Sequence, residues 1–91
     1  MKAAAQAIAR EKDVPLVPLA LLRAGQVGRV GTVLGSGDLV QRLREMGLYD
    51  GAPVQMIRPG SPCIIRLQGQ RLGFRSDDLA RVMVRVSAAA S

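Results

Sequence analysis

Glycine and proline residues cut the middle of this chain into short segments, and this limits the folds open to it. All ten glycines and all five prolines of the 91 residues lie between Pro15 and Gly73. Within that region only residues 38–46 form an uninterrupted stretch long enough for a helix of more than two turns. The sequence therefore predicts a mainly β protein of short strands with one inserted helix.

Residues 38–46 have the pattern of an amphipathic helix with a defined start and end. Apolar residues at positions 39, 40, 43 and 46 share one helical face. Asp38 and Gln41 have the spacing of a capping box at its start. At its end, Gly47 can adopt the left-handed conformation, which lets Leu48 fold back onto Leu43. The pattern thus predicts both ends of the helix.

The rest of the chain is rich in the aliphatic and β-branched residues that favour strands. Residues 14–18 are expected to be extended because each proline biases its predecessor, and one short turn follows over 19–22. Strands are predicted over 29–34, 54–58, 63–67, 71–75 and 82–86, with a hairpin turn at 68–70. Gly31 indicates curvature or close backbone approach. This spacing predicts a small, strongly bent β-barrel of about five strands.

Side-chain alternation predicts which strand residues face the core. Positions 63, 65 and 67, then Leu72 and Phe74, then 82, 84 and 86 are expected to point inward. Cys63 is accordingly interpreted as a small buried hydrophobe. Ser76 is expected to cap a single helical turn that holds Asp77 and Asp78.

The foldable domain is predicted to span residues 14–86, between two tails. Residues 1–13 are interpreted as a flexible N-terminal extension, and residues 87–91 as a disordered tail. The longest charge-free run, residues 14–22, is interrupted by two prolines and is far shorter than the roughly 20 residues that cross a bilayer. We therefore expect a cytoplasmic protein without membrane insertion.

The residue inventory excludes several kinds of chemistry. The sequence has no histidine and one cysteine, which rules out an intrachain disulfide, a tetrahedral zinc site and histidine-assisted nucleophiles within one chain. We expect no catalytic residues, no metal site and no cofactor.

Arginine dominates the charge of the predicted domain. Residues 14–86 contain ten arginines, no lysine and five acidic residues, a net charge of +5. Arginine pairs with carboxylate and phosphate through two parallel hydrogen bonds, so an acidic protein, nucleic acid and an anionic membrane surface all fit. Only Tyr49 and Phe74 are aromatic, and Phe74 is predicted to be buried. Few rings are left to stack on bases, which disfavours RNA.

Two motifs resemble the FeoA family. The first is Arg42-Leu43-x-x-Met46-Gly47-Leu48-x-x-Gly51-x-x-Val54, which follows Gly25 and a strand. The second is Leu72-Gly73-Phe74-Arg75-x-x-x-Leu79-Ala80-x-x-Met83-Val84. The resemblance covers about residues 16–86. It departs from the family in residues 1–13 and at Leu79-Ala80, where the family often has a polar or acidic residue first.

The resemblance implies an SH3-like barrel and a non-catalytic role in bacterial ferrous iron transport. FeoA proteins are cytoplasmic accessory proteins, and the implied partner is FeoB, a membrane transporter with a cytoplasmic GTPase region. The same barrel occurs in metal-dependent repressors, so a detached regulatory barrel that partners such a repressor is an alternative. RNA binding through arginine–phosphate contacts is another. The sequence fits either a monomer or a homo-oligomer.

The helix end is the predicted partner-binding site. We expect an apolar patch of Met46, Leu48 and Tyr49, rimmed by Arg42 and Arg75, to contact an acidic or amphipathic surface. Arg42 has an alternative role, in an ion pair with a carboxylate at position 38 or 45 of the same helix. Tyr49 also has one, as a lid over one barrel end with its hydroxyl in water.

Overall fold

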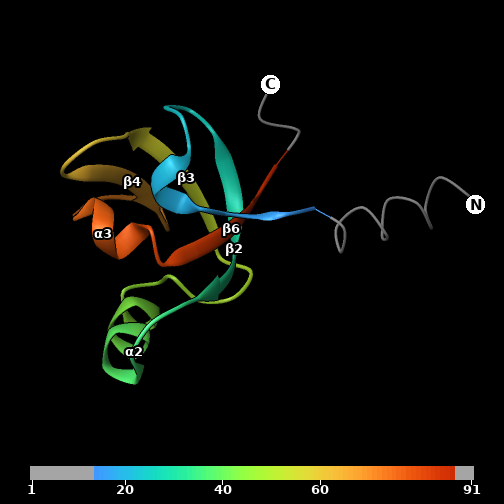
Figure 1. Ribbon diagram of the computed structural model, residues 1–91. Coiled ribbons are helices and arrows are strands. Elements are labelled where there is room, and N and C mark those ends of the chain that lie inside the picture. Colours follow the sequence, from blue (N-terminus) through green and yellow to red (C-terminus); the bar gives the residue numbers. More distant parts are fainter. Residues whose placement is uncertain (1–13, 88–91) are drawn as a thin grey trace, which may run out of the picture.

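The computed structural model describes residues 14–87, which form one antiparallel sheet bent into a barrel (Figure 1). The predicted tail 1–13 and residues 88–91 of the predicted tail 87–91 lie outside the described residues. The sheet order is β1-β6-β2-β3-β4-β5. Its strands are β1 (Leu16–Pro18), β2 (Val27–Val33), β3 (Pro53–Arg58), β4 (Cys63–Leu67), β5 (Gln70–Phe74) and β6 (Val82–Val86). The mainly β class is confirmed, with six strands where about five were predicted.

The additional strand is β1, a segment that the proline pattern predicted only as extended chain. Leu16 lies opposite Arg85 and Pro18 opposite Met83 in the register with β6. The sequence missed this pairing because the two strands are far apart along the chain. The short turn predicted after Pro18 is present as the 3-10 helix η1 (Leu19–Leu21).

Gly31 marks a sharp bend in β2. The register between β2 and β6 shifts between Val30 and Thr32, which leaves Gly31 in a bulge. A Cβ on Gly31 would overlap Leu16 Cδ2 and lie 2.8 Å from Arg85 Nη1. The predicted close approach is confirmed.

The core is aliphatic, as the composition predicted. Within residues 14–87 no polar or charged side chain is buried. Positions 63, 65 and 67 of β4 and positions 82 and 84 of β6 are buried, and so is Phe74. Leu72 and Val86 are half-buried at the edge of this core. Cys63 packs as a small apolar residue, and its Sγ donates to the Gly60 carbonyl at 2.9 Å.

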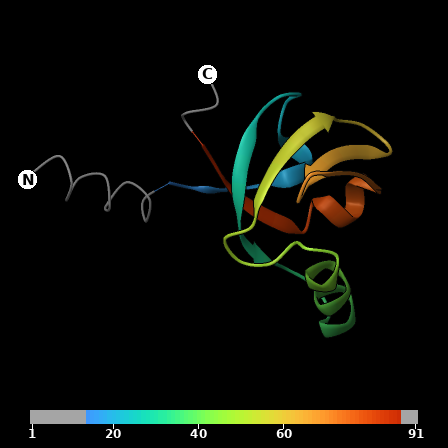
Figure 2. The ribbon, with the colours of Figure 1, turned by 180° about the vertical axis from the view of Figure 1, so that it is seen from behind.

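Two α-helices complete the described fold. The longer one, α2 (Gly37–Glu45), projects beyond one end of the barrel, whereas α3 (Ser76–Leu79) packs beside η1 close to where β6 begins (Figures 1 and 2). The predicted caps were wrong by one or two residues. Ser36, not Asp38, caps α2 by accepting from the Leu39 N–H at 3.3 Å. Ser76 is the first residue of α3 and follows the cap position. None of the described helices is long and apolar enough to span a bilayer.

Candidate protein-binding surface

The C-terminal end of α2 is closed by the backbone motif that the sequence predicted. The Gly47 N–H donates to the Arg44 carbonyl at 3.0 Å, and the Leu48 N–H donates to the Leu43 carbonyl at 3.0 Å. These are the two bonds of a Schellman motif. Gly47 has a φ of +112°, which a side chain would disfavour. The helix therefore ends at a fixed point.

Gly47 also brings the helix end against the β4–β5 hairpin. A Cβ on Gly47 would lie 3.1 Å from Leu67 Cδ2 and 3.4 Å from Gln68 Nε2. Leu48, the next residue, is completely buried in the core. Leu48 thus anchors the helix end to the barrel.

The turn that follows is tied to β2 by three hydrogen bonds. The Gly51 N–H donates to the Val30 carbonyl at 2.6 Å, and the Val30 N–H donates to the Ala52 carbonyl at 2.9 Å. Arg29 Nη1 donates to the Gly51 carbonyl at 3.1 Å. Inside the turn, the Ala52 N–H donates to the Tyr49 carbonyl at 2.9 Å. The backbone of Tyr49 is thereby held on a rigid support.

Met46 and Tyr49 are the exposed apolar residues of this region. Each residue is 43% exposed, although Gly47 and Leu48, which lie between them, are buried. The prediction that Leu48 shares this patch was wrong, because its side chain points inward. We call Met46 and Tyr49 the helix-end patch.

The Tyr49 hydroxyl is held by a neighbouring strand turn. It accepts a hydrogen bond from Gln68 Nε2 at 3.2 Å, which links the turn after α2 to the β4–β5 hairpin. The predicted alternative for Tyr49 was a lid with its hydroxyl in water. The structure differs from it, since the ring is partly exposed and the hydroxyl is hydrogen-bonded to Gln68. The hydroxyl proton is still free to donate to a partner.

The two predicted rim arginines lie on different elements. Arg42 is exposed on α2, and Arg75 is exposed at the cap position of α3. The two helices lie apart in both views (Figures 1 and 2). Across residues 14–87 neither arginine forms an ion pair, so the alternative role of Arg42 is not seen. Glu45 instead accepts from Gln41 Nε2 at 3.3 Å.

Sequence reasoning missed a hollow beside the helix-end patch. A space of about 240 Å³ lies between β2 and α2, and Val40, Arg44 and Tyr49 all line it. The same three residues line a second hollow, of about 470 Å³, on the neighbouring side. Val40 was assigned to the apolar helical face, and its half-buried position beside Tyr49 required the tertiary packing. Tyr49 therefore stands between two recesses.

The family model of the FeoA domain matches residues 17–86. The chain belongs to the FeoA family. This confirms the resemblance that the two sequence motifs carried, and the match covers nearly all of the described residues.

Solved FeoA structures resemble this FeoA chain in both sequence and fold. A crystal structure of an iron uptake regulatory protein (FeoA) is 35% identical, with a TM-score of 0.76 over 80% of this chain and 100% of the other. FeoA from Chlorobium tepidum is 28% identical, with a TM-score of 0.72 over 79% and 71%. FeoA from Stenotrophomonas maltophilia, described as a unique procaryotic SH3 domain protein, is 29% identical, with a TM-score of 0.66 over 79% and 91%. Among curated proteins there is no match.

Metal-dependent regulators share the fold of this FeoA protein but little of its sequence. IdeR from T. acidophilum is 19% identical, with a TM-score of 0.73 over 81% of this chain and 35% of the regulator. At that identity the likeness concerns the fold alone. The SH3-like barrel is thus common to FeoA proteins and to one part of larger regulators.

Metal-binding residues are sparse in the described part of this FeoA protein. No group of three or more cysteine, aspartate or glutamate residues that could hold a metal ion occurs within residues 14–87, and the chain has no histidine. The S. maltophilia FeoA structure is a complex with zinc.

Proposed function

We propose that this FeoA protein is a non-catalytic accessory protein of ferrous iron transport. It would act in the cytoplasm by binding the cytoplasmic GTPase region of a FeoB-type membrane transporter and modulating uptake. Family membership supports the transport role. The S. maltophilia relative is itself described as possibly acting as a bacterial ferrous iron transport activating factor.

The observation that carries the proposal is the rigid exposure of the helix-end patch. Met46 and Tyr49 are each 43% exposed on a backbone that is fixed by the Schellman motif and by the bonds to β2. Methionine and tyrosine are enriched at protein interfaces, and side chains that are already ordered lose little entropy on binding. Such a patch suits a protein partner.

The charge next to the patch favours an acidic or amphipathic partner surface. Arg42 and Arg44 are exposed on α2 and form no ion pair within residues 14–87. Each guanidinium can therefore pair with a partner carboxylate without breaking an existing contact. Arg75, at the N-cap of α3, would contact the same partner only if the interface extends from α2 to α3.

A binding experiment with the soluble cytoplasmic domain of the transporter tests this proposal. By titration calorimetry, Tyr49→Ala and Met46→Asp should each weaken binding at least about tenfold, the loss typical of an interface hot spot. Leu21→Asp is the matched control, because Leu21 is 73% exposed on η1, outside the helix-end patch. Unchanged affinity in both patch variants, with the fold intact by circular dichroism, would overturn the proposal.

RNA binding, the first alternative function, has less support from the structure than it had from the sequence. Phe74 is buried, so Tyr49 is the only exposed aromatic side chain in residues 14–87. One ring cannot form the stacking platform that single-stranded RNA binding uses. The other alternative, a detached regulatory barrel that partners a metal-dependent repressor, rests on the shared fold alone. No contact within residues 14–87 favours it.

A further inference from the structure

The charges of this domain are separated by secondary structure. The six strands carry five arginines and no acidic residue. All five acidic residues of the domain lie in α2, in the turn after it, or in α3. The sheet therefore has a purely positive outer face.

The strand register places arginines of the same charge side by side. Arg66 of β4 lies directly opposite Arg71 of β5, and Arg29 of β2 lies directly opposite Arg85 of β6. Like charges at directly opposed positions destabilise a sheet. Within residues 14–87 no carboxylate pairs with any of them. We call these four residues the arginine face.

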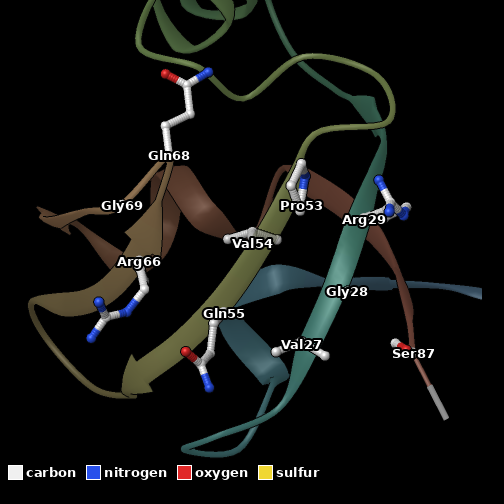
Figure 3. Close-up of a pocket in the computed structure, with 10 residues that line it drawn as sticks. All are labelled: Val27, Gly28, Arg29, Pro53, Val54, Gln55, Arg66, Gln68, Gly69 and Ser87. Atoms are coloured by element: carbon white, nitrogen blue, oxygen red, sulfur yellow. The ribbon is translucent and has the colours of Figure 1, made fainter. Parts of the chain in front are cut away.

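One arginine of each pair, Arg29 and Arg66, lines a hollow with an apolar floor. The hollow has a volume of about 340 Å³ and lies on the outer side of β2, β3 and β4. Figure 3 shows Arg29 of β2 and Arg66 of β4 on opposite sides of it, with Pro53 of β3 between them and Val27 farther along β2. Gln55, opposite both Val27 and Arg66 in the register, adds an amide to the same surface.

The guanidinium groups on this face are partly fixed and have unused donors. Arg29 uses Nη1 to hold the Gly51 carbonyl, which anchors its side chain beside the hollow. Arg85 Nε is buried and has no hydrogen-bond partner, and Arg85 Nη1 lies against Gly31. No bond within residues 14–87 occupies the side-chain donors of Arg66 or Arg71.

We infer that the arginine face binds an extended acidic segment of a partner protein. Carboxylates would pair with Arg29 and Arg66 across the hollow, and an apolar side chain between them would enter its floor. No aromatic ring lines the hollow, so a nucleobase would find no stacking partner there. This surface is separate from the helix-end patch, so the inference holds whichever partner that patch binds.

A short fluorescent peptide of aspartate, glutamate and leucine provides the test, with the matched asparagine and glutamine peptide as its neutral counterpart. Fluorescence anisotropy should detect the acidic peptide and not the neutral one. Arg66→Gln/Arg71→Gln should weaken binding about tenfold or more, since the charge-assisted contact to Arg66 and the attraction of the adjacent Arg71 charge are both lost. Arg23→Gln/Arg81→Gln removes the same charge from exposed positions outside this face and should change affinity less than about twofold.

Three results would overturn the inference. The first is equal weakening by both double variants, which would mean that net charge alone attracts the peptide. The second is oligouridylate binding that displaces the acidic peptide and is weakened by the same variant, which would identify nucleic acid as the ligand. The third is a loss of self-association in Arg66→Gln/Arg71→Gln by analytical ultracentrifugation, which would identify a second copy of this chain as the occupant.

Discussion

Gln68 donates a hydrogen bond from Nε2 to the Tyr49 hydroxyl at 3.2 Å. The bond joins two parts of the chain that contribute residues to different surfaces. Tyr49 belongs to the helix-end patch, whereas Gln68 also lines the hollow of the arginine face (Figure 3). One side-chain contact therefore connects the two proposed binding surfaces.

This contact should behave as a coupled pair. Tyr49→Phe and Gln68→Ala should each lower the free energy of unfolding by about 0.5 kcal/mol, because the bond is exposed to solvent. In the double variant the two losses should overlap, since both remove the same bond. Urea denaturation of the four proteins measures the coupling. Fully additive losses would show that the bond contributes nothing to stability.

Two neighbouring apolar residues should differ sharply in their effect on stability. Leu48→Ala removes a completely buried side chain and should cost about 2–5 kcal/mol, whereas Met46→Ala should cost under about 1 kcal/mol. Binding to the transporter domain should show the reverse order once the fold is intact. Thermal and urea unfolding measure the first effect. Equal costs would contradict the burial of Leu48.

Glycines in different surroundings should respond oppositely to alanine. A Cβ on Gly28 would lie 2.7 Å from the Arg85 carbonyl oxygen, so Gly28→Ala must displace backbone of β6 and should cost more than about 1 kcal/mol. Gly37, at the start of α2, has nothing within 4 Å of the same position. Gly37→Ala should be neutral or stabilise by up to about 1 kcal/mol. Paired urea titrations check both signs.

Relief of like-charge repulsion should stabilise the sheet. Arg71→Glu places a carboxylate directly opposite Arg66 and should raise the free energy of unfolding by about 0.2–1 kcal/mol. Arg58→Glu is the charge-matched control, because Arg58 faces Ile64 in the register. The gain should shrink in high salt, which screens exposed charges. An equal gain in both variants would point to net charge and not to the cross-strand pair.

Cys63 should be protected from thiol reagents. It is 1% exposed, and its Sγ donates to the Gly60 carbonyl. Reaction with Ellman's reagent should be slow in the native protein and fast in denaturant, because access requires unfolding. A native rate close to the denatured rate would show that the β4 end opens readily.

The local elements of this fold follow from short stretches of the sequence. The Schellman bonds at Gly47 and the two-residue turn at Gln68 and Gly69, both with positive φ, depend on residues a few positions apart. Glycine conformational freedom and side-chain periodicity are sufficient to predict such features. The family motifs lie within these same local segments, which is why the resemblance was recognisable before the fold was known.

Long-range packing, in contrast, sets which side chains reach the surface and which charged residues lie opposite each other. Leu48 is buried although Met46 and Tyr49 on either side are exposed, because Gly47 lets the chain pack against Leu67. The opposition of Arg29 to Arg85 depends on the register of two strands more than fifty positions apart. Long-range register follows from how all the strands share one core, and no short sequence pattern encodes it.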